Sequence, residues 1–249
     1  MKEQIYTIPV NEVYDTDCSC PLCELENRIE RESVEYALGA AMMEPDFRVE
    51  SNERGYCRVH YAKLFEKPNK LSLALILDTH LMEIRKRLEA EESGIKALSR
   101  QKSGLFKKNG AKDAAQKLHS ITDKINCDCM ICKKVNFTME RYIDVIMYMY
   151  FTDTDFKEKF NKSNGFCFKH FNDVLKIMPS SLSDSQTKEF LPALFEKEKL
   201  LLDGLQEDIH NFTLKFDYRN KDIPWGNAKD APIRVIQALS GTANDDKNE

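Results

Sequence analysis

The sequence contains the same pair of cysteine motifs twice, and this repetition restricts the fold more than any other feature. Residues 18–23 read CSCPLC, and residues 127–132 read CDCMIC 109 positions later. Residues 55–61 read GYCRVHY, and residues 165–171 read GFCFKHF 110 positions later. The order is kept with one inserted residue, so we interpret the chain as an internal duplication of helical units.

All eight cysteines lie in these motifs, and each half adds one histidine. A Cys-x-x-Cys pair and a Cys-x-x-His pair supply the four thiolate and imidazole ligands that a tetrahedral zinc ion needs. Side chains three positions apart face the same way across a helical turn, so both members of a pair reach one ion. We therefore predict two zinc sites, one per half, with the ligands Cys20, Cys23, Cys57 and His60 in the first and Cys129, Cys132, Cys167 and His170 in the second.

Cys18 and Cys127 remain outside this count, because each forms a Cys-x-Cys with the next cysteine. Each is a candidate additional ligand or a reactive thiol. A [4Fe–4S] cluster held by the four cysteines of each half is the alternative to zinc. If they are exposed beside a bound cation and a helix start, these two thiols are expected to have a lowered pKa.

The composition favours an all-α fold. The chain has only 9 Gly and 8 Pro in 249 residues, below the usual shares of about 7% and 5%. Ile143, Ile146, Met147 and Tyr150 recur at helical spacing. Long helices are predicted over 71–92 and over 184–217, the latter started or kinked by Pro192, and a final helix begins at Pro232 and ends before Gly241.

The predicted organisation is two pseudo-repeated helical units packed together. The boundaries are a first repeat at 1–92, a flexible basic linker at 93–112, a second repeat at 113–224, and a C-terminal helix with a disordered tail at 225–249. The linker region has three glycines, and residues 100–117 carry six Lys or Arg against one Asp. We interpret that run as a solvated connector.

Several function classes are disfavoured by the sequence. The net charge of −4 argues against nucleic-acid binding, which favours a basic surface. The sequence has no apolar run long enough to span a membrane and no signal-peptide core near its start, so we expect a cytoplasmic protein. No catalytic motif is readable, which favours a binding or scaffold protein over an enzyme. A thiol-based redox or metal-handling protein is the alternative, and the partner, a protein or a small molecule, is not identified.

The chain resembles an uncharacterised bacterial family of cysteine-rich proteins. The resemblance rests on CPLCEL (20–25), GYCRVHY (55–61), LALILDTHL (73–81), GFCFKH (165–170), KFDYR (215–219) and PWG (224–226). The family has no assigned activity, so the resemblance implies a family without a function. It also draws attention to Asp217, Tyr218, Arg219 and Trp225, which form either a polar pocket or a helix-end cap with the tryptophan packed on the core.

Overall fold

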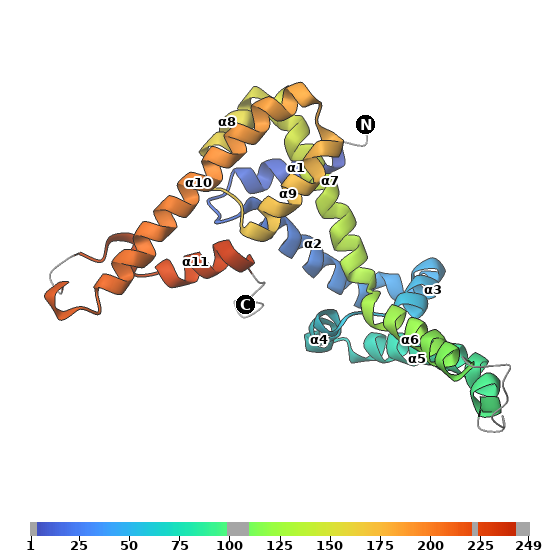
Figure 1. The fold of residues 1–249 in the computed structure, drawn as a ribbon. Coiled ribbons are helices and arrows are strands. Elements are labelled where there is room, and N and C mark those ends of the chain that lie inside the picture. Colours follow the sequence, from blue (N-terminus) through green and yellow to red (C-terminus); the bar gives the residue numbers. More distant parts are fainter. Residues whose placement is uncertain (1–3, 99–109, 221–223, 243–249) are drawn as a thin grey trace. The chain divides into compact units, whose positions relative to one another are not determined.

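The computed structural model describes residues 4–98, 110–220 and 224–242, which fold into helices with no β-strand among them. Figure 1 shows the helices in chain order. The predicted all-α class is therefore confirmed. The internal duplication stays an interpretation of the sequence.

Among the described residues, the α-helices range in length from 9 residues in α4 and α8 to 31 residues in α10. They are α1 (Gln4–Tyr14), α2 (Pro21–Leu38), α3 (Pro45–Arg54), α4 (Arg58–Glu66), α5 (Lys70–Leu98), α6 (Gly110–Cys127), α7 (Met130–Thr152), α8 (Thr154–Lys162), α9 (Phe168–Ser181), α10 (Asp184–Leu214) and α11 (Ala231–Ser240), with short 3-10 turns η1 (Ala40–Met43), η2 (Tyr218–Asn220) and η3 (Gly226–Ala228).

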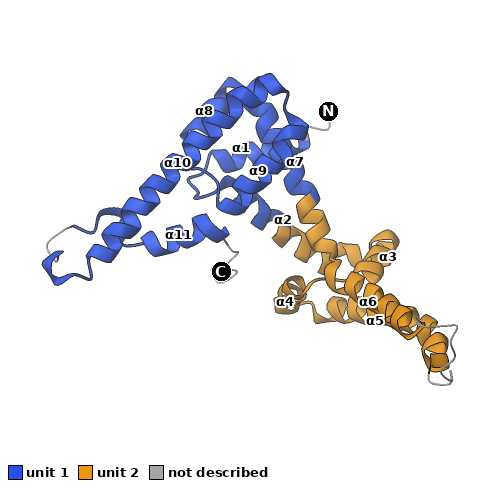
Figure 2. Cartoon of the chain, in the orientation of Figure 1, with its two compact units in different colours: residues 1–29, 137–249 blue, residues 30–136 orange. Residues whose placement is uncertain are grey.

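The chain divides into two compact units, coloured separately in Figure 2. Unit 1 comprises residues 1–29 and 137–249, and unit 2 comprises residues 30–136. These units do not coincide with the two sequence halves, because helices α2 and α7 each contribute residues to both units. Unit 2 combines residues 30–92 of the predicted first repeat with residues 113–136 of the second.

The core of unit 1 is aromatic. The ring of Phe190 on α10 lies 4.9 Å from Tyr150 and 5.4 Å from Phe160, measured between centroids. Tyr14 on α1 contacts Phe156 edge-to-face at 4.9 Å. Such edge contacts stabilise a core beyond the area that the rings bury. Helices α1, α7, α8 and α10 are therefore packed around one cluster.

Helix α10 begins at Asp184, as predicted, and ends at Leu214, three residues before the predicted end. The Ser183 side chain accepts a hydrogen bond from the backbone N–H of Gln186, and the Gln186 side chain reciprocates, so the two form a capping box. Pro192 lies inside the helix, and the prediction that it starts the helix is wrong. The cap satisfies the first N–H groups, so the helix is established before the proline removes one hydrogen bond. Helix α11 ends at Ser240, before Gly241, as predicted.

In unit 2, helix α5 packs against α3 and α6. Its inner face buries Leu73, Ile76 and His80. The Nδ1 atom of His80 lies 2.7 Å from the carbonyl oxygen of Asn52, so His80 is a hydrogen-bonded core histidine. Of the predicted linker, residues 93–98 continue α5 and residues 110–112 begin α6, while the rest lies outside the described residues.

Two further predictions concern the C-terminal tail and the absence of a membrane-spanning segment. Of the predicted disordered tail, residues 243–249 lie outside the described part. No helix in that described part combines the length and the apolar character that a bilayer crossing requires.

Candidate metal centres

Four cysteine or histidine side chains converge in each unit. In unit 1, site 1 comprises Cys20, Cys23, Cys167 and His170, and in unit 2, site 2 comprises Cys57, His60, Cys129 and Cys132. The ligand atoms of each group lie within 4.8 Å of one another. Both groups are geometrically suited to hold a metal ion.

The predicted pairing within each half is wrong. Each site joins the Cys-x-x-Cys of one half to the Cys-x-x-His of the other. Helix α2 has 18 residues and rises about 27 Å, whereas the 10-residue α3 spans only about 15 Å, too short to carry the chain back to Cys20. In the second half, the 9-residue α8 is likewise too short to carry the chain back along the 23-residue α7 to Cys129. A cluster held by the four cysteines of one half is excluded by the same geometry, because Cys57 belongs to a different site from Cys20 and Cys23.

All four motifs lie at helix starts. Cys20 and Cys129 directly precede α2 and α7, and Cys57 and Cys167 cap α4 and α9. Unpaired N–H groups and the helix dipole at such ends favour thiolate over thiol. Two sulfurs also accept backbone hydrogen bonds, Cys129 from the N–H of Cys132 at 3.5 Å and Cys23 from that of Thr242 at 3.4 Å.

The spacing within site 1 is that of ligands around one tetrahedral ion. The Nδ1 atom of His170 lies 3.5, 3.4 and 3.2 Å from the sulfurs of Cys20, Cys23 and Cys167, and the last two sulfurs are 3.6 Å apart. A tetrahedral zinc ion, with bonds of about 2.3 Å to sulfur and about 2.0 Å to nitrogen, places sulfurs about 3.8 Å apart and sulfur about 3.6 Å from nitrogen. The two sets of distances agree within a few tenths of an ångström.

Site 2 repeats this geometry. The Nδ1 atom of His60 lies 3.2, 3.3 and 3.4 Å from the sulfurs of Cys57, Cys129 and Cys132, and the sulfurs of Cys57 and Cys132 are 3.8 Å apart. The burial differs, because all four residues of site 1 are buried, whereas Cys57 and Cys132 of site 2 are half-buried. Solvent therefore has better access to site 2.

The outer nitrogen of each histidine faces a glutamate from helix α2. His60 Nε2 forms a hydrogen bond with Glu30 at 3.0 Å, and His170 Nε2 lies 3.2 Å from an oxygen of Glu26. Lys63 and Lys169 also pair with these carboxylates. Such a carboxylate orients an imidazole so that its other nitrogen is free to bind metal.

Sequence reasoning missed both glutamates, although a signal was present. Glu26 and Glu30 follow Cys23 by three and seven positions, so all three share one helix face. The hydrogen bond from His60 is the main reason that the pKa of Glu30 is held at about 2. Burial raises the pKa of Glu26, but His170 and Lys169 outweigh it and lower that pKa below the usual value.

The electrostatics of both sites favour a cation. Burial lowers the pKa of His60, but its hydrogen bonds to Cys129 and Glu30 outweigh this effect and raise the pKa to about 10. His170 behaves alike, because Cys167, Cys23 and Glu26 outweigh burial and raise its pKa to about 11. The neighbouring sulfur and carboxylate groups therefore stabilise the positively charged form of each imidazole. A bound metal ion would supply this positive charge in place of the proton.

A glycine and an ion pair hold the two motifs of site 2 together. Gly55 has φ +64°, and a Cβ atom there would lie 2.3 Å from Nε2 of His80. Its carbonyl oxygen accepts a hydrogen bond from the N–H of Met130 at 3.1 Å. Arg54 pairs with both oxygens of Asp128, at 2.8 and 2.9 Å. These contacts fix the loop before Cys57 against the loop before α7.

At site 1, a buried carboxylate holds the loop before Cys167, the counterpart of the loop before Cys57 at site 2. Glu198 on α10 is 6% exposed and accepts a 2.6 Å hydrogen bond from the N–H of Phe166, the residue before Cys167. Burial raises the pKa of Glu198 to about 7, against the opposing effects of the Phe166 N–H and Lys197. The carboxyl group therefore positions the Cys-x-x-His loop of site 1.

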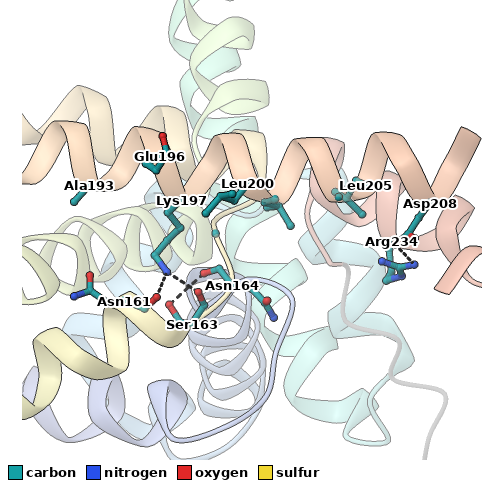
Figure 3. A pocket seen from close by; sticks show the side chains of 13 residues that line it. Asn161, Ser163, Asn164, Ala193, Glu196, Lys197, Leu200, Leu205, Asp208 and Arg234 are labelled. Atoms are coloured by element: carbon teal, nitrogen blue, oxygen red, sulfur yellow. Dashed lines mark hydrogen bonds and ion pairs between the residues drawn. The ribbon is translucent and has the colours of Figure 1, made fainter. Parts of the chain in front are cut away.

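A cavity lies beside site 1. Its volume is about 190 Å³, and Cys20 and Cys167 contribute to its wall. A neighbouring hollow of about 550 Å³ shares Asn164 and Arg234 with it. Figure 3 shows this hollow, with the Lys197 amine donating to the backbone oxygens of Asn161 and Ser163 and with Arg234 paired with Asp208.

Cys18 and Cys127 lie outside both groups of four. Cys18 is half-buried, and burial raises the pKa of its thiol. The lowered pKa expected for an exposed Cys18 is therefore not what its surroundings produce. Cys127 is exposed and donates its S–H to Asp123 at 3.7 Å.

The residues of the predicted polar pocket lie at an exposed helix end. Asp217 and Arg219 pair with each other at 2.5 Å, and the Tyr218 side chain is 77% exposed. Trp225 is 45% exposed and packs against the ring of Phe212 at 5.9 Å. This placement gives the pocket hypothesis no support.

Comparison with known proteins gives a family and no activity. No curated protein and no solved structure matches the chain. One family model, described as a family of unknown function, DUF6062, matches residues 1–246. That match includes both cysteine motifs of each half and the helices that carry them. The chain therefore belongs to the family of unknown function DUF6062.

Proposed function

We propose that this protein is a cytoplasmic binding or scaffold protein whose two Cys₃His sites each hold one structural zinc ion. The observation that carries the proposal is the convergence of three sulfurs and one imidazole nitrogen at tetrahedral spacing, twice in one chain. The carboxylate behind each histidine supports it, because ligating histidines usually have such a partner. The eight free cysteines suit the cytoplasm, where thiols stay reduced.

Zinc is the metal that the donor set favours. Three thiolates and an imidazole form a common structural zinc site, and four protein ligands leave no open position for substrate. In a [4Fe–4S] cluster, each cysteine binds a different iron, so the sulfurs stand farther apart than ligands of a single ion. The sulfur pair of Cys23 and Cys167, 3.6 Å apart, fits a single ion.

Each ion would connect helix starts that are distant in sequence. Site 1 would join α2 to α9, and site 2 would join α4 to α7. Structural zinc contributes about 10–16 kcal/mol of apparent binding free energy in small peptides. In this chain, the aromatic core shares the stabilising role. Each unit would then be held rigid by its own ion and would present its own surface to a partner.

The proposal is tested by pairs of cysteine substitutions with the zinc content as readout. The full chain should hold two zinc ions. Cys23→Ser combined with Cys167→Ser removes two ligands from one site, so one ion should remain. Cys23→Ser combined with Cys57→Ser damages both sites, so both ions should be lost. Retention of one ion by the second pair would contradict the assignment, as would iron in place of zinc.

Metal handling at site 2 is a second candidate, and the half-buried sulfurs of Cys57 and Cys132 favour it. An exchange partner can reach exposed thiolates more easily than buried ones. If this function is correct, a chelator should remove the ion of site 2 much faster than that of site 1. The variant Cys23→Ser/Cys167→Ser isolates site 2 for this measurement. If the chelator removes the ions of both sites equally slowly, the metal-handling function is wrong and the structural function remains.

A further inference from the structure

Helix α11 is held onto unit 1 by few buried side chains of its own. It packs against α9 and α10, but Ala231 is the one buried residue of this helix. Its large apolar side chains face outward, since Ile233, Ile236 and Leu239 are 56%, 60% and 60% exposed. A helix that buries so little apolar surface gains little hydrophobic stabilisation. Contacts beyond its own packed face are therefore important for its position.

The chain that follows α11 lies directly against site 1. It turns at Gly241, where φ is +85°, and a Cβ atom there would lie 3.4 Å from the sulfur of Cys23 and 3.6 Å from that of Cys167. The N–H of Thr242 donates to the Cys23 sulfur at 3.4 Å. The carbonyl oxygen of Thr242 accepts a hydrogen bond from the Asn27 side chain at 3.1 Å. The end of α11 is therefore attached to the metal ligands themselves.

These contacts lie where zinc would join helices α2 and α9. Cys23 and Asn27 are on α2, and Cys167 caps α9. The two sulfurs are free thiols 3.6 Å apart, so a shared ion would be what keeps them at this distance. A zinc-bound sulfur is a thiolate, and an N–H group binds a charged acceptor more strongly than a neutral one. Zinc would therefore fix both sulfurs and strengthen the hydrogen bond from Thr242.

We propose that α11, with Gly241 and Thr242, is a zinc-dependent latch that is docked when site 1 holds its ion and released when the site is empty. The inference rests on the proposed zinc occupancy of site 1 and adds a regulatory consequence to it. Release would remove Arg234, Gln237 and Ala238 from the wall of the cavity beside site 1. The surface of α9 and α10 that α11 covers would then be open to solvent.

The first test follows amide hydrogen exchange in the full chain by mass spectrometry. Cys20→Ser/His170→Ala empties site 1 without altering the two sulfurs that contact the end of α11. In this variant the amides of α11 should exchange at least about tenfold faster than in the zinc-loaded wild type, a factor typical of coupling between two sites. The matched control, Cys129→Ser/His60→Ala, changes the equivalent motif positions of site 2 and should leave the exchange of α11 unchanged.

Zinc content and the exchange of the α10 core separate the ways in which this test can fail. A wild type without zinc would contradict the proposed function, and the latch with it. A site 1 variant that has lost one ion but keeps slow exchange in α11 would overturn the latch alone. Equally faster exchange in the buried α10 segment around Phe190 and Leu194 would show general unfolding, which also contradicts a latch.

The second test reaches the same coupling from the side of the helix, with every zinc ligand intact. Gly241→Val strains a backbone at φ +85° and adds bulk beside both sulfurs, so the end of α11 should detach. Because coupling between two sites is reciprocal, the zinc affinity of site 1 should then fall at least about threefold, while that of site 2 stays the same.

Ser240→Val is the matched control for this variant, because it adds the same side chain at the exposed preceding position. It should change neither the exchange of α11 nor the zinc affinity of either site. Competition with a chromophoric chelator measures the affinities. A wild-type affinity at site 1 in Gly241→Val, or an equal loss in Ser240→Val, would overturn the proposal.

Discussion

The Nε2 atom of His60 lies 3.0 Å from an oxygen of Glu30, and this contact determines which nitrogen of the ring faces the sulfurs. An oxygen of Glu26 lies 3.2 Å from Nε2 of His170 and so faces that ring from the same side. Because both glutamates come from helix α2, the helix that begins at the first Cys-x-x-Cys also orients a histidine in each unit.

Removing the Glu30 carboxylate should weaken zinc binding at site 2. Loss of such an orienting group typically costs about 10–100-fold in metal affinity. We therefore expect Glu30→Ala to lower the affinity of site 2 by that factor, while Glu30→Gln, which keeps an acceptor oxygen, should lose less. Competition with a chromophoric chelator measures the affinity of each site. Glu35→Ala on the same helix, where the carboxylate pairs with Lys67 at 3.6 Å, is the control and should change neither site.

Glu198 should make the stability of the protein depend on pH. Its pKa is about 7 in the folded chain and 4.5 in the ordinary reference, because burial disfavours the charged form. Between these values the folded state holds a proton that the unfolded state has released. The contribution of Glu198 to the free energy of unfolding should therefore fall as pH rises from about 4.5 to about 7, by about 3 kcal/mol at most, and stay level above that.

The check is a comparison of wild type with Glu198→Gln, which stays neutral and can still accept from the Phe166 N–H. The difference between their free energies of unfolding, from denaturant titration, should change across this pH window in favour of the variant. Zinc content at each pH confirms that both proteins are equally loaded. Parallel stability curves would show that Glu198 titrates normally.

The helical fold and the residues of the metal sites were readable from local pattern, whereas the pairing of the motifs was not. Low Gly and Pro content and helical spacing are local properties, and so is the Cys-x-x-Cys or Cys-x-x-His unit. Which pairs meet depends on whether α3 is long enough to return the chain along α2, and the boundaries of those helices are poorly marked in the sequence. Glu30 is a different case. Its spacing from Cys23 is visible in the sequence, but its contact with His60 can be inferred only once it is known which motifs meet at each site.

Gly55 should tolerate no side chain. Its φ of +64° disfavours any L-residue, and a Cβ atom would lie 2.3 Å from His80. We expect Gly55→Ala to destabilise unit 2 by about 2–4 kcal/mol, combining backbone strain and overpacking, and to reduce zinc binding at site 2. Gly94→Ala is the matched control, because nothing lies within 4 Å of its Cβ and alanine favours a helix. Thermal unfolding of both variants distinguishes a local clash from a general effect.

Cys18 and Cys127 should be dispensable for metal binding. Each site already has four ligands without them, and a closed structural zinc site takes four. Cys18→Ser and Cys127→Ser should therefore retain two zinc ions and the thermal stability of the wild type. Loss of an ion from either variant would show that the thiol is a ligand.

The same two thiols should differ in their reactivity toward alkylating agents. Cys127 is exposed, whereas Cys18 is half-buried with a raised pKa, so less of it is thiolate at neutral pH. Mass spectrometry of the folded, zinc-loaded protein should find Cys127 labelled first and Cys18 more slowly. The six cysteine ligands should react only after a chelator has removed the metal. Rapid labelling of Cys18 would favour the redox alternative, because it would reveal an activated thiol beside site 1.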